Sequence, residues 1–155
     1  MFDDITMLGL KYYGMGENRM AELHVEAAAE NLEQVINFVE TRLEELECPL
    51  KIQMQIDVAV EEIFVNIANY AYQSGTGQVT IGIDKEEEAG LVTIRFADSG
   101  IPFNPLELEN PDITLSAEER NIGGLGIYMV KKSMDDISYE YKDGQNILTI
   151  KKKIP

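Results

Sequence analysis

Two helix-length stretches of apolar periodicity, one directly after the other in the chain, constrain the fold most strongly. In residues 27–47 apolar side chains recur every three or four positions and acidic residues occupy the other face, which is typical of an amphipathic helix. Cys48-Pro49 ends this helix, because the residue before a proline disfavours the helical conformation. A second apolar stripe predicts another helix over about residues 51–72. Both helices need an apolar surface to cover.

Short runs rich in apolar residues supply that surface as predicted strands. These strands are expected at residues 22–26, 79–84, 91–97, 137–141 and 145–153. Residues 101–122 contain prolines and little periodicity, which is typical of a long functional loop. A third helix is expected from the glycines at 123–126 to about Met134. This order predicts an α+β fold, a two-layer α/β sandwich whose mixed, mostly antiparallel sheet is covered on one face by helices.

Composition narrows the classes of function. The chain has 155 residues, which suits one domain with its own core. A net charge of −15 disfavours binding to nucleic acid or to an anionic membrane surface. No apolar run approaches the roughly 18 residues of a membrane span, and the N-terminal residues lack the pattern of a secretory signal. Cys48 is the only cysteine, so it cannot form an internal disulfide, and we expect a cytoplasmic protein.

Three polar residues share one face of the second predicted helix. Glu62, Asn66 and Asn69 are spaced i, i+4 and i+7. Asparagine is a mediocre helix former, which makes two of them in a helix with an apolar stripe unusual. An amide oxygen can bind Mg²⁺, and a carboxylate one turn away can accept a hydroxyl proton. On spacing alone, a solvated polar face is the alternative.

Two glycine-containing segments follow. Asp98 comes directly after a predicted strand and begins the run Asp98-Ser99-Gly100-Ile101-Pro102-Phe103-Asn104-Pro105. A carboxylate there can accept a hydrogen bond from the exocyclic amine of adenine. The alternative is a plain Asp-x-Gly turn without a ligand. Gly123, Gly124 and Gly126 open a helix whose free N–H groups can bind phosphate. Their spacing matches neither a P-loop nor a Rossmann fingerprint.

In this order the three segments resemble the N, G1 and G2 boxes of the histidine-kinase-like (GHKL) ATPase superfamily, and most of all its anti-sigma-factor serine/threonine kinase branch. The resemblance spans about residues 21–153. Residues 62–66 resemble the N-box, residues 98–105 the G1 box with Pro102 replacing the second glycine, and residues 123–132 the G2 box. The fold that this implies is the Bergerat ATP-binding fold.

The resemblance implies a role for each matched residue. Glu62 would be the catalytic base that takes a proton from a partner's Ser or Thr, and Asn66 would be the Mg²⁺ ligand. The residues implied to bind the ATP cofactor are Asn66, Asn69, Asp98, Gly100, Pro102, Gly123, Gly124, Leu125, Gly126 and Thr149. Among them, Asp98 and Thr149 would contact adenine, and Gly100 would make room for the base.

The glycine turn and the loop before it complete the implied site. Backbone N–H groups at 124–126 would meet the phosphates, and residues 106–122 would form a lid over ATP. Two features depart from the branch. Tyr70 stands where a histidine is frequent, and the lid is acidic, with Arg120 as its single candidate phosphate contact.

The resemblance also implies partners. Members of the branch phosphorylate a small STAS-domain anti-anti-sigma protein, bind a sigma factor as the competing partner, and often form homodimers. We therefore expect a Mg·ATP-dependent serine/threonine kinase of a partner-switching system. The alternative is a non-catalytic nucleotide-sensing interaction module that regulates an attached or partner phosphatase, which the acidic lid and Tyr70 favour. An unrelated two-layer sandwich that binds no nucleotide is a third interpretation.

The N-terminal segment lies outside this pattern. Residues 3–6, Asp-Asp-Ile-Thr before an apolar run, resemble the last strand of PPM-type phosphatases, and residues 12–16 are interpreted as a linker. We expect residues 1–19 to be a remnant strand and linker resembling a phosphatase C-terminus, fused to a histidine-kinase-like ATPase domain at 20–155. An ordinary N-terminal strand is the alternative.

Overall fold

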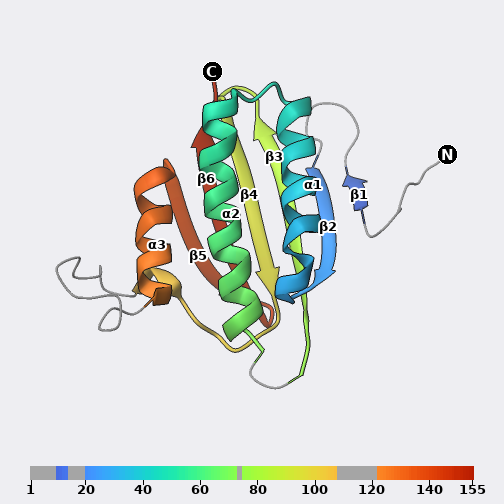
Figure 1. Ribbon diagram of the computed structural model, residues 1–155, viewed down its shortest axis with the longest axis vertical. Coiled ribbons are helices and arrows are strands. Elements are labelled where there is room, and N and C mark those ends of the chain that lie inside the picture. The colour runs from blue at the N-terminus through green and yellow to red at the C-terminus, as the bar shows by residue number, and fades with distance from the viewer. Residues whose placement is uncertain (1–9, 14–19, 73–74, 108–121) are drawn as a thin grey trace.

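The computed structural model describes residues 10–13, 20–72, 75–107 and 122–155 (Figure 1). The strands of this part of the chain are β1 Leu10–Tyr13, β2 Met20–Glu26, β3 Gln78–Glu86, β4 Leu91–Asp98, β5 Asp136–Lys142 and β6 Gln145–Lys153. The helices are α1 Leu32–Glu45, α2 Leu50–Tyr70 and α3 Ile122–Ser133, with short 3₁₀ turns η1 Ala29–Asn31 and η2 Pro105–Glu107. No helix among the described residues is long and apolar enough to cross a membrane.

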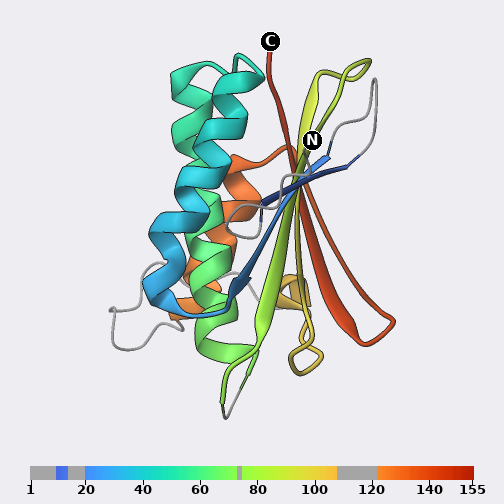
Figure 2. The ribbon, with the colours of Figure 1, turned by 90° about the vertical axis from the view of Figure 1, so that its right-hand side faces the viewer.

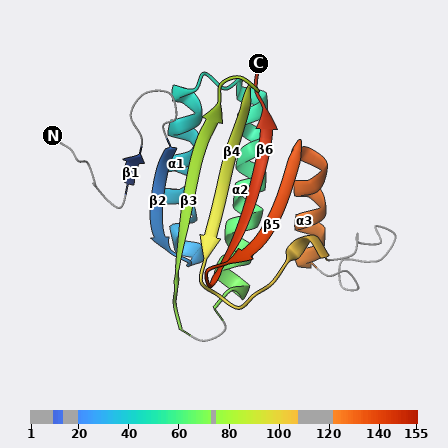
Figure 3. The same cartoon turned by 180° about the vertical axis from the view of Figure 1, so that it is seen from behind.

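The strands form one sheet in the order β1-β2-β3-β4-β6-β5, and each described pairing is antiparallel. Figure 2 shows α1, α2 and α3 together on one side of this sheet. The view from behind shows the other face of the sheet without a covering helix (Figure 3). The predicted two-layer α/β sandwich is therefore confirmed.

The core lies between the sheet and the helical layer. Side chains alternate between the two faces of a strand, so Val79, Ile81 and Ile83 of β3 all turn toward the helices and are fully buried. Ile81 pairs with Phe96 of β4 and Ile83 with Ile94, which extends the same apolar face across the sheet. The fully buried side chains that the helices contribute include Val35, Val39, Leu43, Ile56, Val60, Ile63 and Phe64.

The first helix is shorter than its apolar pattern predicts. α1 begins at Leu32 rather than near residue 27, because the backbone N–H of Ala27 donates to Gly77 O at 2.8 Å and stays aligned with the sheet. Asn31 donates its side-chain amide to Glu26 O at 2.9 Å at this entry to the helix. The Asp143-Gly144 turn is as predicted, with positive φ at both residues.

The N-terminal segment contributes to the same sheet. Tyr12 and Tyr13, interpreted as linker, belong to β1, which pairs antiparallel with β2. Residues 1–9 and 14–19 lie outside the described residues. The domain boundary at residue 19 and the phosphatase resemblance therefore stay predictions.

Candidate functional site

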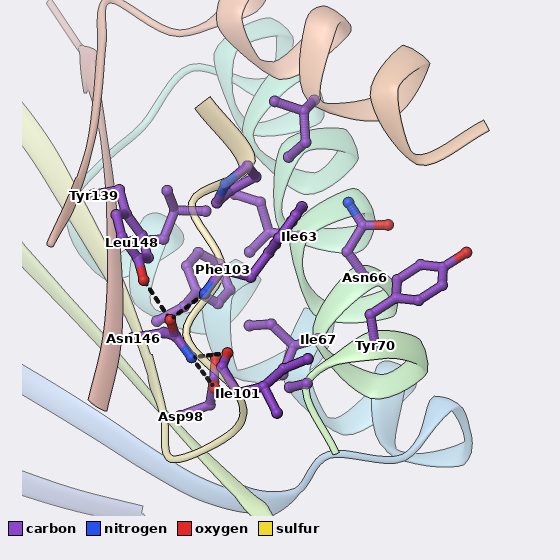
Figure 4. Close-up of a pocket in the computed structure, with 14 residues that line it drawn as sticks. Ile63, Asn66, Ile67, Tyr70, Asp98, Ile101, Phe103, Tyr139, Asn146 and Leu148 are labelled. Carbon is purple, nitrogen blue, oxygen red and sulfur yellow. Dashed lines mark hydrogen bonds between the residues drawn. The ribbon is translucent and has the colours of Figure 1, made fainter. Parts of the chain in front are cut away.

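A cavity of about 370 Å³ lies between α2 and the end of the sheet where β4 finishes (Figure 4). Its walls are mostly apolar, with side chains from α2, β4, α3, β5, β6 and the segment after β4, among them Ile63, Ile67, Phe96, Ile127 and Leu148. The polar side chains in this lining include Asn66, Asp98 and Asn146. The volume is within the range of roughly 300–1,000 Å³ for small-molecule sites. An apolar cavity with a few polar groups suits a flat aromatic ring.

Asp98 is the last residue of β4 and is 5% exposed. It turns toward the helices because it lies two residues after Phe96 on the same strand face. Its Oδ1 accepts hydrogen bonds from Gly100 N at 2.9 Å and from Asn146 Nδ2 at 3.0 Å. Its Oδ2 accepts none from the part of the chain that the structure describes. A carboxylate oxygen can only accept hydrogen bonds, so Oδ2 suits a ligand that brings an N–H group.

Asn146, near the start of β6, is a polar cavity residue for which the sequence predicted no role. It is 7% exposed and turns to the same face as Leu148 and Ile150. That alternation was the available signal, because it places a polar side chain at an inward position. Its Nδ2 also donates to Ile101 O at 2.9 Å, and its Oδ1 accepts from Phe103 N at 3.0 Å.

Thr149 lies on the opposite face of β6, so the prediction that it contacts adenine is wrong. It pairs with Arg95 of β4, which is exposed on the face that no helix covers. The side chains before and after it, Leu148 and Ile150, are the buried ones. A strand cannot present consecutive side chains to one face, and Thr149 does not contribute to the cavity lining.

Gly100 has a packing role that the sequence did not predict. A Cβ atom on Gly100 would lie 2.2 Å from Ala71 O, at the end of α2. The next residue, Ile101, donates its N–H to that same carbonyl at 3.0 Å. The glycine therefore permits close approach to the end of α2. Its role in making room for the base stays a prediction. Pro102 is exposed and does not line the cavity, although Ile101 and Phe103 on either side do.

The three polar residues predicted on one face of α2 do not all reach the cavity. Asn66 lines the cavity, and its side-chain amide makes no hydrogen bond with the described residues. Glu62, one turn earlier, is partly exposed and outside the cavity lining, and Asn69 is exposed and also outside it. The Glu62 carboxylate instead faces α3, since a Cβ atom on Gly126 would lie 2.1 Å from Glu62 Oε2.

The predicted glycine turn forms the start of α3. The helix begins at Ile122, so Gly123, Gly124, Leu125 and Gly126 lie within its first turns. The first N–H groups of a helix have no partner within it and favour anions. Ile127 follows directly and lines the cavity. Residues 108–121, most of the predicted lid, lie outside the described residues, so the phosphate roles of the glycines stay predictions.

The donor set fits a magnesium ion only in part. Among the described residues, no group of three or more His, Cys, Asp or Glu side chains could hold a metal ion. Asn66 offers a single amide oxygen at the cavity. Mg²⁺ is commonly held by one or two protein oxygens together with waters and substrate phosphates. Asn66 could therefore hold Mg²⁺ only together with waters and the phosphates of a ligand, and its role as a metal ligand stays a prediction.

Two tyrosine hydroxyl groups lie near Asp98. Tyr72 donates to Gln78 O at 2.7 Å and accepts from Ser99 N at 2.8 Å. Burial is the main cause that raises the pKa of both Tyr72 and Tyr139, and the charge of Asp98 raises each pKa further. Both hydroxyl groups therefore stay protonated and act as hydrogen-bond donors at neutral pH. Tyr139 donates to Asn146 Oδ1, inside the cavity wall (Figure 4).

The chain is similar to proteins named "Serine-protein kinase RsbW" from Bacillus species. It is 32% identical to the protein from Bacillus mycoides (strain KBAB4) over 98 residues, which are 61% of this chain and 60% of that protein. It is 31% identical over 98 residues to the protein from Bacillus cereus (strain G9842), with the same coverage. The chain thus spans 60% of the length of these relatives.

A solved structure with the same fold contains the RsbU and RsbW domains of Rv1364c from Mycobacterium tuberculosis. The TM-score is 0.60 at 14% sequence identity, and the match covers 86% of this chain and 32% of that chain. A likeness at this identity shows the fold alone. It agrees with the antiparallel sheet covered on one face by helices (Figure 2).

The match to a family model extends over nearly the whole described chain. The model described as "Histidine kinase-like ATPase domain" matches residues 25–152. That range contains α2, β4, α3, β5 and all but the last residue of β6, and these elements contribute side chains to the cavity. The chain therefore belongs to the histidine kinase-like ATPase domain family.

Proposed function

We propose that this chain is a Mg·ATP-dependent serine/threonine protein kinase of the anti-sigma-factor type, acting in the cytoplasm. Its substrate would be a STAS-domain anti-anti-sigma protein, and a sigma factor would be the competing partner. The observation that carries the proposal is the apolar cavity in which buried Asp98 has one carboxylate oxygen that accepts no hydrogen bond from the described residues. The similarity to RsbW serine-protein kinases supports the class of reaction.

The cavity would take the adenine ring. Its apolar walls suit the faces of the ring, and Asp98 Oδ2 would accept a hydrogen bond from the exocyclic amine. Asn66, on the neighbouring wall, has an amide without a partner among the described residues and would hold Mg²⁺. When bound, Mg²⁺ neutralises charge on the phosphates. The first N–H groups of α3 would face those phosphates.

Glu62 would act on the partner's hydroxyl group. It lies one turn before Asn66 on α2, outside the cavity lining and partly exposed, where a second protein can reach it. Its carboxylate would take the hydroxyl proton while the hydroxyl oxygen bonds to the γ-phosphorus of ATP. The bond from that phosphorus to the β,γ-bridging oxygen breaks, and ADP leaves.

The test uses radiolabelled ATP, the purified chain and a STAS-domain protein from the same operon. We expect transfer of label to the STAS protein, and Glu62→Gln should lower the rate at least about 100-fold. The same variant should keep its affinity for Mg·ADP within about twofold, because Glu62 does not line the cavity. The matched control is Glu61→Gln, at an exposed neighbouring position, which should transfer label normally.

The results separate this proposal from the alternatives. Full activity of Glu62→Gln would contradict the role of Glu62. Nucleotide binding by the wild type without any labelling of the STAS protein would favour the nucleotide-sensing module. Absence of Mg·ADP and Mg·ATP binding in calorimetry would contradict both.

A further inference from the structure

The hydrogen bonds of Asn146 define the orientation of its side chain. Its Nδ2 lies against acceptors, namely Asp98 Oδ1 at 3.0 Å and Ile101 O at 2.9 Å. Its Oδ1 lies against donors, the N–H of Phe103 at 3.0 Å and the hydroxyl of Tyr139. The opposite orientation of the amide would place NH₂ against the N–H of Phe103, and this excludes it. Figure 4 shows these partners converging on Asn146.

These contacts leave Asn146 without capacity for a ligand. An amide side chain has two N–H donors and two lone pairs on its oxygen, and protein groups occupy all four. Asn146 is also 7% exposed. It therefore acts on a ligand through its neighbours and is a positioning residue.

The neighbour that matters most is Asp98. Its Oδ1 already accepts from Asn146 and from Gly100 N, so Asn146 prevents the carboxylate from turning that oxygen to the cavity. The ligand meets the remaining oxygen, Oδ2, which is only an acceptor when the carboxyl group is ionised. Ile101 and Phe103, whose backbone groups bond to Asn146, also line the cavity. The Asn146 side chain thus orients both the Asp98 carboxylate and the backbone of the segment that contains Ile101 and Phe103.

We propose that Asn146 sets the base selectivity of this site, by holding Asp98 so that the cavity accepts a purine with an exocyclic amine and rejects one with a carbonyl there. The inference rests on the proposed function, which requires a purine in this cavity. A purine carbonyl would bring its lone pairs against Asp98 Oδ2, and no hydrogen bond would form because neither oxygen carries a hydrogen. A site built to hydrogen-bond one group discriminates strongly against an analogue that lacks it.

The experiment compares Mg·ADP with Mg·IDP by calorimetry, because inosine carries a carbonyl where adenosine carries the amine. The wild type should prefer ADP by at least about tenfold. Asn146→Asp keeps the shape of the side chain but loses both donors and brings a second carboxyl group to Asp98. The ADP preference of this variant should fall to within about threefold, because one shared proton lets the pair donate as well as accept.

The matched control is Leu148→Ala, on the same face of β6 and also in the cavity wall. Loss of its apolar contact should weaken ADP and IDP binding by the same factor and leave their ratio unchanged. Tyr139→Phe is the second variant, because it removes one donor to Asn146 Oδ1 and leaves the rest of the hydrogen bonds. Tyr139→Phe should lower the ADP preference by a smaller factor than Asn146→Asp. If thermal melting shows that Asn146→Asp is unfolded, Tyr139→Phe tests the role of Asn146 in its place.

The outcomes are distinguishable. A wild-type preference that persists unchanged in the folded variants would overturn the role of Asn146 and leave the proposed function standing. Equal binding of ADP and IDP by the wild type would also overturn the role of Asn146 and leave the proposed function standing. If the wild type bound neither nucleotide, the proposed function would fail and the inference with it.

Discussion

Asn146 Nδ2 donates a hydrogen bond to Asp98 Oδ1 at 3.0 Å, across 48 positions of the chain. The two residues lie opposite each other in the register of β4 and β6. Both are buried on the helix-facing side of the sheet. The Asp98–Asn146 pair of the cavity is therefore a consequence of strand pairing, and substitutions on the two faces of the same strands should have different effects.

Asp98→Asn should weaken Mg·ADP binding at least about tenfold, because the amide has lost one acceptor oxygen and its NH₂ opposes either Asn146 or the ligand amine. Thr149→Val is the matched control on the outer face of β6, and its affinity should stay within about twofold of the wild type. Calorimetry at one salt concentration gives both values. A loss in Thr149→Val as large as that in Asp98→Asn would contradict the assignment of faces.

Gly126→Ala should lower phosphotransfer more than it lowers stability. The new Cβ would lie 2.1 Å from Glu62 Oε2, and the end of a flexible side chain can move away at little cost. Alanine also favours a helix over glycine by up to about 1 kcal/mol. Transfer to the STAS protein should fall at least about tenfold while the melting temperature changes little.

The double variant provides the check on this mechanism. In a Glu62→Gln background, Gly126→Ala should reduce transfer no further, because the two changes act through the same carboxylate. A further loss of equal size would indicate that Gly126 acts on the phosphates independently of Glu62.

Gly100→Ala should destabilise the fold by more than about 2 kcal/mol. The Cβ would lie 2.2 Å from Ala71 O and 2.7 Å from Ala71 C, and these backbone atoms cannot move without shifting the end of α2. Urea denaturation followed by circular dichroism measures the change. A variant with wild-type stability and reduced ADP affinity would support the prediction that Gly100 makes room for the base.

Stability should depend on pH through a carboxyl pair between α1 and α2. Burial, together with a hydrogen bond and charge repulsion from Glu40, raises the pKa of Asp57 to about 7. Asp57 Oδ1 is buried and accepts no hydrogen bond from the described residues. The folded state therefore keeps a proton that the unfolded chain has lost. The free energy of unfolding should fall as pH rises from about 4 to about 7, and then level off.

Asp57→Asn removes this titration and keeps a donor toward Glu40. The difference in the free energy of unfolding between pH 5 and pH 8 should shrink by about 1 kcal/mol, a modest value because the pair is only partly buried and water screens it. Urea titrations of both proteins at the two pH values measure it. An unchanged pH dependence in Asp57→Asn would exclude the pair as its source.

The secondary structure was largely predictable, because helical and strand periodicity are properties of short stretches of sequence. The long helices, the Asp143-Gly144 turn and the strand that ends at Asp98 agree with their patterns. The start of α1 differs from its pattern, because Ala27 donates a hydrogen bond to Gly77, which lies in a distant segment of the chain. Local patterns carry no information about such a partner.

The site was predictable only in its general position. Asp98 and Asn66 were predicted, and both line the cavity. The resemblance implied a role for Thr149 and none for Asn146. The two residues lie three positions apart on β6, and an odd separation along a strand puts side chains on opposite faces. The packing role of Gly100 was not predicted, because the approach of Ala71 depends on where α2 ends against the sheet.

The sequence by itself determined which segments form helices and strands, which face of each is apolar, and which polar residues interrupt those faces. Only the tertiary structure decided that Asn146 reaches Asp98, and that Glu62 faces Gly126 while Asn66 faces the cavity. The physical reason is that periodicity is set by neighbours along the chain. Contacts at the site are set by strand register and by the packing of α3 against α2, which join residues far apart in the sequence.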